Sequence, residues 1–188
     1  MYSIPLSVPS INGNEWQYVK ECLDTEWVSS AGKYVEEFER KIAEYTGVRH
    51  AVACVNGTSA LQVSLRLSGV STGHEVIVPT LTFIAPINAI AYNGASPIFM
   101  DSDEYYNIDA EKTIDFIKNE TEFKDGYTVN MSTKNKISAI IPVHVWGNAT
   151  WLDELIPLCA ERNIAVVEDA SESLGTFYSK GSHTGKHT

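Results

Sequence analysis

Short runs of valine and isoleucine alternate along this chain with longer segments of helical periodicity. The clearest strand candidates are 76–78, 137–143 and 164–167, and a helical segment lies next to each of them. Strands that are apolar throughout, rather than at every second position, are typical of a parallel sheet buried on both faces. Strands that alternate with helices form layered α/β domains. The pattern therefore predicts an α/β fold with a mainly parallel sheet covered by helices.

The remaining segments extend this prediction. Asn12 and Glu15 have the spacing of a capping box, and Gly47 is placed to end a second helix. Helices are expected over 12–24, 34–45, 57–68, 83–92, 109–118 and 151–162, and further strands over 50–55 and 97–100. The polar segment 119–135 is interpreted as a surface excursion, and the tail 179–188 as a segment without core-forming residues.

Charge and composition exclude several classes of function. The chain carries 24 acidic and 14 basic residues, a net charge of -10, which argues against nucleic acid or an anionic membrane as partner. No apolar run approaches the ~20 residues that span a bilayer, and residues 1–10 lack the features of a signal peptide. We therefore expect a cytoplasmic protein. Three widely separated cysteines, with no metal-ligand spacing, predict no metal site.

The first segment that can carry chemistry is Asn56-Gly57-Thr58-Ser59, between a predicted strand and a predicted helix. The glycine permits close approach, and the first turn of a helix offers unpaired N–H groups and a favourable dipole to a phosphate. The alternative is an ordinary capped helix, since serine and threonine favour that position.

Two further segments follow predicted strands. Asp169 comes at the carboxyl end of strand 164–167, where open α/β sheets place their ligands; its carboxylate can pair with a protonated ring nitrogen. Phe83 follows strand 76–78 and can stack on a flat ring. The alternatives are an acidic cap for Asp169 and a core aromatic at a helix start for Phe83.

Taken in order, these segments resemble the DegT-type sugar aminotransferases, a branch of the fold-type-I pyridoxal-phosphate enzymes. The matching blocks are WVSSAGKYVEEFE at 27–39, NGTSAL at 56–61, PTLTF at 79–83, HVWG at 144–147 and EDA at 168–170. The resemblance implies a three-layer αβα large domain with a mixed, mostly parallel sheet, present in truncated form. Residues 1–188 would be the N-terminal part of this cofactor-binding domain, with its C-terminal portion and the small domain absent.

The resemblance also implies a binding site for pyridoxal 5'-phosphate. Gly57, Thr58 and Ser59 would hold the phosphate. Phe83 would stack on the pyridine ring, and Asp169 would pair with the ring nitrogen.

Two more residues receive roles from the resemblance. Glu172 stands where many relatives have glutamine or histidine near the ring hydroxyl, although a carboxylate there is an acceptor. His144 lies where the fold places a residue near the ring; a histidine satisfied at a strand end is the open alternative.

The lysine that forms the Schiff base lies, in relatives, in a segment of the Ser-Phe-Asn-x-x-Lys kind. That segment would fall beyond Thr188, so no catalytic residue is assigned within the chain. Lys180 and Lys186 stand in the polar tail without that context. His183 and His187, without further ligands, make a poor metal site.

The implied activity is transfer of an amino group, with glutamate as donor, to a keto group on a nucleotide-linked deoxy sugar. A 4-keto substrate, a homodimer and a role in amino-sugar or surface-glycan synthesis are expected. Without the lysine, the 188 residues themselves are expected to be inactive. The alternative is a catalytically inactive binding or regulatory module with this fold. A doubly wound nucleotide-binding domain is disfavoured because no Gly-x-Gly-x-x-Gly follows the first strand.

Overall fold

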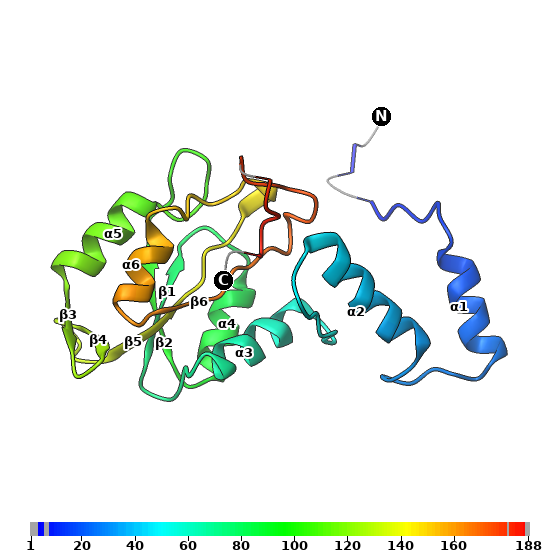
Figure 1. Ribbon diagram of the computed structural model, residues 1–188, viewed down its shortest axis with the longest axis horizontal. Helices are drawn as coiled ribbons and strands as arrows, with labels where there is room; N and C mark the ends of the chain where they lie inside the picture. The colour runs from blue at the N-terminus through cyan, green and yellow to red at the C-terminus, as the bar shows by residue number, and fades with distance from the viewer. Residues whose placement is uncertain (1–3, 6–7, 180, 187–188) are drawn as a thin grey trace.

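The computed structural model describes residues 4–5, 8–179 and 181–186. A mixed sheet lies between helices in one part of the molecule, and two further helices extend to its side (Figure 1). In chain order the elements are α1 (Glu15–Asp24), α2 (Lys33–Thr46), α3 (Gly57–Leu67), β1 (Glu75–Pro79), α4 (Ile84–Tyr92), β2 (Ser96–Met100), α5 (Ala110–Asn119), β3 (Thr121–Lys124), β4 (Tyr127–Asn130), β5 (Lys136–Ile140), the short 3-10 helix η1 (Val145–Gly147), α6 (Leu155–Glu161) and β6 (Ala165–Val166).

The sheet is mostly parallel, as predicted. Strands β2, β1 and β5 lie side by side in that order, all parallel. β6 pairs in parallel with the end of β5. β4 pairs antiparallel with the start of β5 and continues the sheet to β3. The carboxyl ends of β1, β5 and β6 therefore meet at one edge of the sheet.

An apolar core lies on each face of the sheet, and the interior strand β1 is buried between the two. Val76 and Val78 point into a core that includes Leu65 of α3. Ile77, between them, points into a second core with Ile117 of α5. Successive side chains of a strand point to opposite faces. One run of three apolar residues therefore packs against the helices on both faces of the sheet. This is the three-layer αβα arrangement.

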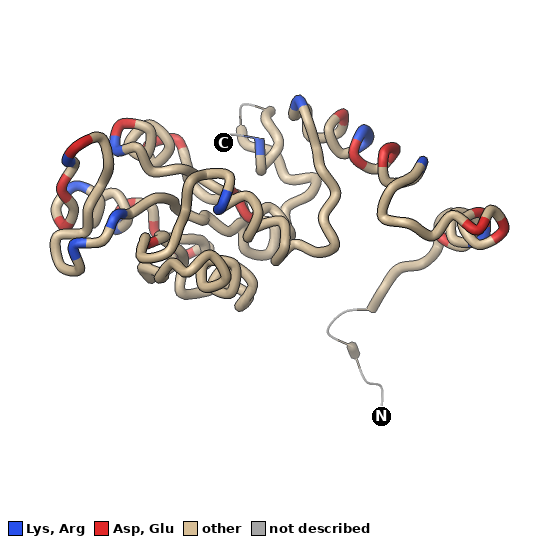
Figure 2. The backbone as a smooth tube through the Cα atoms, turned by 90° about the horizontal axis from the view of Figure 1, so that it is seen from below, with Lys and Arg blue, Asp and Glu red and all other residues tan. Residues whose placement is uncertain are grey.

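Helices α1 and α2 lie outside these layers (Figure 1), and neither contains a buried residue. Figure 2 shows acidic (red) and basic (blue) positions alternating along the backbone of α2. Two of the pairs are ion pairs one helical turn apart, Arg40 with Glu44 at 2.7 Å and Lys41 with Glu37 at 2.8 Å. Exposed pairs of this kind contribute only ~0.3–0.5 kcal/mol each. Gly47 ends α2 in the left-handed conformation (φ 74°), as the sequence predicted.

Two predictions for the N-terminal third are wrong. The capping box does not form: Asn12 donates its side-chain amide to the Ser10 hydroxyl (3.0 Å), and α1 begins at Glu15. Segment 50–55 is not a strand in the described structure. It has no strand beside it, and Ala53 donates its backbone N–H instead to the Glu39 carboxylate (2.8 Å). A strand requires a partner as well as apolar residues.

Segment 119–135 is not the predicted surface excursion but a hairpin of the sheet. Asp125 and Gly126 both have positive φ (54° and 83°) and turn the chain between β3 and β4. An Asp-Gly pair is the preferred two-residue hairpin turn. Thr128 and Asn130 of β4 are buried.

The expectation for the tail is wrong as well. His183 and Thr184 are buried, and Tyr178 donates its backbone N–H to the Ser182 carbonyl (2.9 Å). The segment folds back because its hydroxyl and imidazole groups find partners there, such as Ser173 with Thr184 at 2.8 Å. Lys180 and His187 lie outside the described residues. No helix within the described ranges is long and apolar enough to cross a membrane.

Candidate active site

A cavity of about 230 Å³ opens at the carboxyl edge of the sheet. It is formed where the start of α3, the segment after β1 and the segment after β6 converge. Its lining brings together five of the seven residues predicted to bind the cofactor. The full set is Gly57, Thr58, Leu61, Thr82, Phe83, Ala85, Val143, Asp169, Ser171 and Glu172.

The start of α3 provides the polar end of this cavity. Asn56 is extended (φ -163°), and its side-chain oxygen accepts the N–H of Ser59 (2.9 Å). Gly57 and Thr58 occupy the first turn, where N–H groups lack partners within the helix. An added Cβ at Gly57 would come 3.6 Å from the Ser171 hydroxyl. Ser59 does not line the cavity, and its amide is already engaged, so only its hydroxyl remains for a ligand.

Asp169 provides the anionic group. Its backbone is held at the sheet edge because it donates to the Pro142 carbonyl (2.9 Å) and accepts from the His144 N–H (3.1 Å). One carboxylate oxygen, Oδ1, accepts both the Ser171 N–H (3.1 Å) and the Ser171 hydroxyl (2.6 Å). Oδ2 has no hydrogen-bond partner among the described residues, although the side chain is buried. The carboxylate is thus anchored through one oxygen and has an acceptor left for a cationic ring nitrogen.

Phe83 stands at the rim. Its backbone is extended (φ -60°, ψ 160°) immediately before α4, and 72% of its surface is exposed. That exposure excludes the alternative of a core aromatic. A flat apolar ring next to the cavity is suited to stack on a planar ligand.

Glu172 also lines the cavity, and it contacts the short helix η1. One of its carboxylate oxygens accepts the N–H of Trp146 (2.7 Å). Trp146 has a left-handed backbone (φ 54°, ψ 25°), which is uncommon for a bulky residue and occurs most often at functional sites. The turn thereby orients Glu172 and leaves the Trp146 ring exposed next to it.

His144 lies behind the cavity and does not line it. Its Nδ1 accepts the Thr150 N–H (3.1 Å), so the ring proton belongs on Nε2, which donates to Glu168 (3.0 Å). The side chains of both His144 and Glu168 are buried. With both ring nitrogens engaged, the geometry favours the alternative of a satisfied strand-end histidine. A direct contact between His144 and the cofactor stays a prediction.

Sequence reasoning missed Ser171, which anchors the Asp169 carboxylate. The signal was available, because a serine two residues after an aspartate often hydrogen-bonds to it in a local turn. It also missed Thr82, which lines the cavity beside Phe83.

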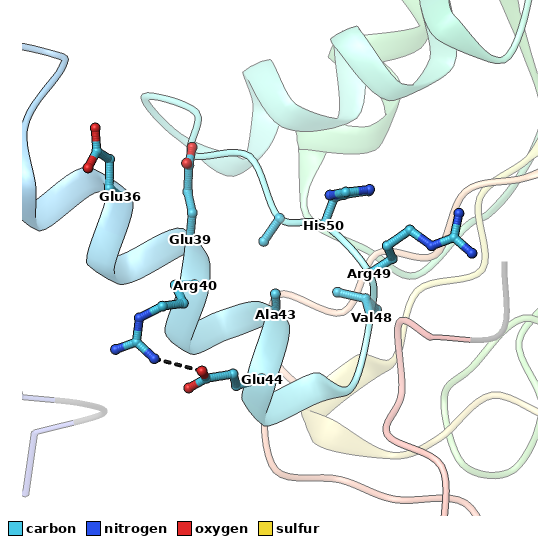
Figure 3. Close-up of a pocket in the computed structure, with 9 residues that line it drawn as sticks. Glu36, Glu39, Arg40, Ala43, Glu44, Val48, Arg49 and His50 are labelled. Atoms are coloured by element: carbon cyan, nitrogen blue, oxygen red, sulfur yellow. Dashed lines mark hydrogen bonds and ion pairs between the residues drawn. The ribbon is translucent and has the colours of Figure 1, made fainter.

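A second hollow of about 450 Å³ lies between α2 and segment 48–51. In Figure 3 the side chains of Glu36 and Glu39 extend from one side of α2, while Arg49 and His50 project from the facing segment. Arg40 is neutralised by Glu44 (2.7 Å). None of the predicted cofactor residues lines this hollow.

Across the described ranges, no three histidine, cysteine or acidic side chains are grouped to hold a metal ion.

Comparison with known proteins agrees with this geometry. GDP-perosamine synthase of Escherichia coli O157:H7 is 42% identical over 98% of this chain and 46% of its own length. EpsN of Bacillus subtilis, named as a pyridoxal phosphate-dependent aminotransferase, is 35% identical over 97% of this chain and 44% of its length. The aminotransferase from Psychrobacter cryohalolentis superposes with a TM-score of 0.80 at 32% identity, covering 96% of this chain and 42% of that structure.

The chain thus spans less than half the length of these relatives. The family model for DegT/DnrJ/EryC1/StrS aminotransferases matches residues 9–188. The match includes every element that builds the cavity. The chain therefore belongs to the DegT/DnrJ/EryC1/StrS aminotransferase family, whose enzymes use pyridoxal phosphate.

Proposed function

We propose that this chain holds pyridoxal phosphate in the cavity at the sheet edge and serves transamination of a keto group on a nucleotide-linked deoxy sugar. The observation that carries the proposal is the Asp169 carboxylate, anchored through Oδ1 by Ser171 with Oδ2 unengaged among the described residues. The first turn of α3 lies in the same cavity. Its backbone N–H groups have no partners within the helix. An anion site and a carboxylate in one small cavity fit a ligand with a phosphate and a basic ring nitrogen.

Each end of the cavity suits one part of this cofactor. The amides of Gly57 and Thr58, with the Ser59 hydroxyl, would bind the phosphate through unpaired donors and the helix dipole. Asp169 would keep the ring nitrogen protonated, because a nearby opposite charge favours the cationic form. Phe83 would cover one face of the ring.

Two residues complete the arrangement. Glu172 would accept a hydrogen bond from the ring hydroxyl, since an ionised carboxylate is only an acceptor. His144 would act indirectly, by positioning Asp169, because its backbone N–H donates to the Asp169 carbonyl (3.1 Å). The cofactor, when bound, supplies the electron sink for proton loss at the carbon that carries the amine. The residues of this chain bind it and orient its ring.

For the substrates we propose a 4-keto deoxy sugar as amino acceptor and glutamate as amino donor. The similarity to GDP-perosamine synthase leads us to propose a guanosine diphosphate-linked sugar and a product used in polysaccharide synthesis. The family resemblance also leads us to propose a cytoplasmic homodimer.

No lysine lines the cavity in the described structure. The family's anchoring lysine has no counterpart in the motif blocks of these 188 residues. We therefore expect the 188 residues by themselves to bind pyridoxamine 5'-phosphate, which needs no covalent anchor, without turning over a keto sugar.

The test has two parts. Calorimetric titration of the 188-residue chain with pyridoxamine phosphate should show one site per chain, and a full-length version should aminate a GDP-linked 4-keto sugar with glutamate. Absence of pyridoxamine phosphate binding would contradict the cofactor site. Binding without turnover by the full-length protein, across GDP- and UDP-linked 3-keto and 4-keto sugars, would instead support a regulatory module.

A further inference from the structure

A second hollow adjoins the proposed cofactor cavity. Its volume is about 270 Å³. Thr82, Phe83, Val143 and Glu172 line both hollows, whereas the start of α3, where the phosphate would bind, lines only the cofactor cavity. A molecule in the second hollow would therefore lie beside the cofactor on the side away from the phosphate.

This hollow is poor in polar groups that a ligand can reach. The Thr80 hydroxyl already donates to the Met100 carbonyl (3.1 Å), and the Thr82 hydroxyl is inaccessible to solvent. Glu172 supplies the negative charge of the lining, and no lysine or arginine of the described chain lines the hollow. Moving an anion out of water is costly unless a cation accompanies it. The hollow is therefore unsuited to the carboxylates of glutamate or to a diphosphate, and it suits an uncharged, partly apolar group.

Trp146 is the largest aromatic residue of the lining. It is 67% exposed, so a ligand can reach it. Its position is fixed because its N–H donates to Glu172 (2.7 Å) and its ring makes a T-shaped contact with Tyr106, with 4.8 Å between the ring centroids. The face of an aromatic ring is negative, which attracts the weakly positive C–H groups on one side of a sugar ring. A ring that is already held in place also loses little freedom on binding.

Resting on the proposed function, we infer that the sugar ring of the amino acceptor occupies this hollow and stacks on Trp146. The keto carbon must reach the amine on the cofactor, so the part of the acceptor beside the cofactor is the sugar. The nucleoside diphosphate lies outside the hollow. A deoxy sugar has a C–H group where another sugar has a hydroxyl, which agrees with a lining that includes Leu81 and Phe83. Trp146 is thus a specificity-determining residue for the acceptor and has no part in the binding of glutamate.

The test compares Trp146→Ala with Trp151→Ala in the full-length protein. Trp151 is similarly exposed, at 63%, but lines a different hollow and neither of these two. Both substitutions remove an exposed indole, and Trp146→Ala keeps the backbone N–H that Glu172 accepts. Both variants should therefore keep the wild-type melting temperature and the wild-type affinity for pyridoxamine phosphate.

The two half-reactions can be followed separately through the absorbance of the cofactor. Trp146→Ala should raise the concentration of keto sugar that gives the half-maximal rate about three- to tenfold, the range expected for the loss of one aromatic stacking contact. The half-reaction with glutamate should not change. Trp146→Phe, which keeps a flat ring, should recover most of the loss, and Trp151→Ala should behave like the wild type in both half-reactions.

A binding measurement without turnover isolates the contribution of the sugar. Calorimetry on the protein loaded with pyridoxamine phosphate compares GDP with a GDP-linked deoxy sugar that lacks the keto group. The wild type and Trp151→Ala should bind the sugar nucleotide more tightly than GDP. Trp146→Ala should lose most of that difference and keep the wild-type affinity for GDP.

Three results would overturn the inference. The first is the full wild-type preference for the sugar nucleotide in Trp146→Ala, or no such preference in a wild type that aminates keto sugars. The second is an equal loss of affinity for GDP alone, which would place the nucleotide on Trp146. The third is an equal change in the half-reaction with glutamate. A wild type that aminates no keto sugar would instead overturn the proposed function, and the inference with it.

Discussion

Replacement of His144 by phenylalanine tests the buried network that supports the cavity from behind. The ring is fully buried, and the Glu168 side chain next to it is 1% exposed. Phenylalanine fills a similar volume but removes one hydrogen-bond partner from each of two groups, although Glu168 Oε2 keeps the Gly185 N–H (2.9 Å). The Thr150 N–H loses its acceptor at 3.1 Å, and the Glu168 carboxylate loses a donor at 3.0 Å.

The expected cost follows from those two groups. A buried N–H without a partner costs ~1–3 kcal/mol, and a hydrogen bond to a charged group contributes ~1.5–3 kcal/mol. Together they should lower the free energy of unfolding by about 3–5 kcal/mol, a large part of the ~5–15 kcal/mol of an ordinary domain. Urea denaturation followed by circular dichroism measures this change, with the denaturant slope unchanged.

Two controls separate the network from the chemistry of histidine itself. His50 is exposed, so His50→Phe should change the unfolding free energy by less than ~0.5 kcal/mol. Glu168→Gln keeps an acceptor for the Nε2–H of a neutral imidazole and should cost less than ~1 kcal/mol. A loss below ~1 kcal/mol for His144→Phe would refute the reasoning. A loss of several kcal/mol for Glu168→Gln would show that the charge of Glu168, and not only its hydrogen bond with His144, stabilises the fold.

Further predictions concern the carboxylate, the thiols and a histidine at the opposite end of the sheet. Asp169→Asn removes the charge that pairs with the ring nitrogen and should weaken pyridoxamine phosphate binding more than about tenfold, by ~1.5–3 kcal/mol; unchanged affinity in calorimetry would argue against that pairing. Burial raises the pKa of the Cys159 thiol to about 12. In the native protein at pH 8, a disulfide reagent should therefore modify the exposed Cys54 and spare Cys159. Equal rates of modification of the two thiols would contradict the packing of α6. Burial and Lys136 lower the pKa of His74 below its ordinary 6.5; the folded state then disfavours the imidazolium, so stability present above pH 6.5 should fall as the pH drops toward 5. His74→Gln should flatten that decline in denaturation curves, and an equal slope for both proteins would exclude His74 as its source.

The layered fold could be predicted because two of its strands, β1 and β5, are buried on both faces. Val76 and Val78 pack against the helices on one face of the sheet, and Ile77 packs against those on the other. An apolar run of this kind is typical of a parallel sheet with helices on both faces. Segment 50–55 shows the limit of that reasoning. It has the composition of a strand, but a strand forms only where another segment lies beside it to pair with. The local sequence does not show whether such a segment is present.

The site could be predicted in part for a related reason. Gly57, Phe83 and Asp169 follow strands or begin helices, and the carboxyl edge of a parallel sheet brings such residues together. The engagement of His144 by Thr150 and Glu168 could not be read from the sequence, because it depends on tertiary contacts of a buried ring. The Asp125-Gly126 turn, in contrast, was a readable local signal that the polar composition around it obscured.

The most direct measurement of the central claim is a crystal structure of this chain grown with pyridoxamine 5'-phosphate. The account predicts the ligand in the cavity at the sheet edge, with its phosphate on the amides of Gly57 and Thr58. The ring nitrogen should lie within hydrogen-bond distance of Asp169 Oδ2, and the ring should stack on Phe83. A ligand bound elsewhere, or bound here with its ring nitrogen turned away from Asp169, would contradict the account.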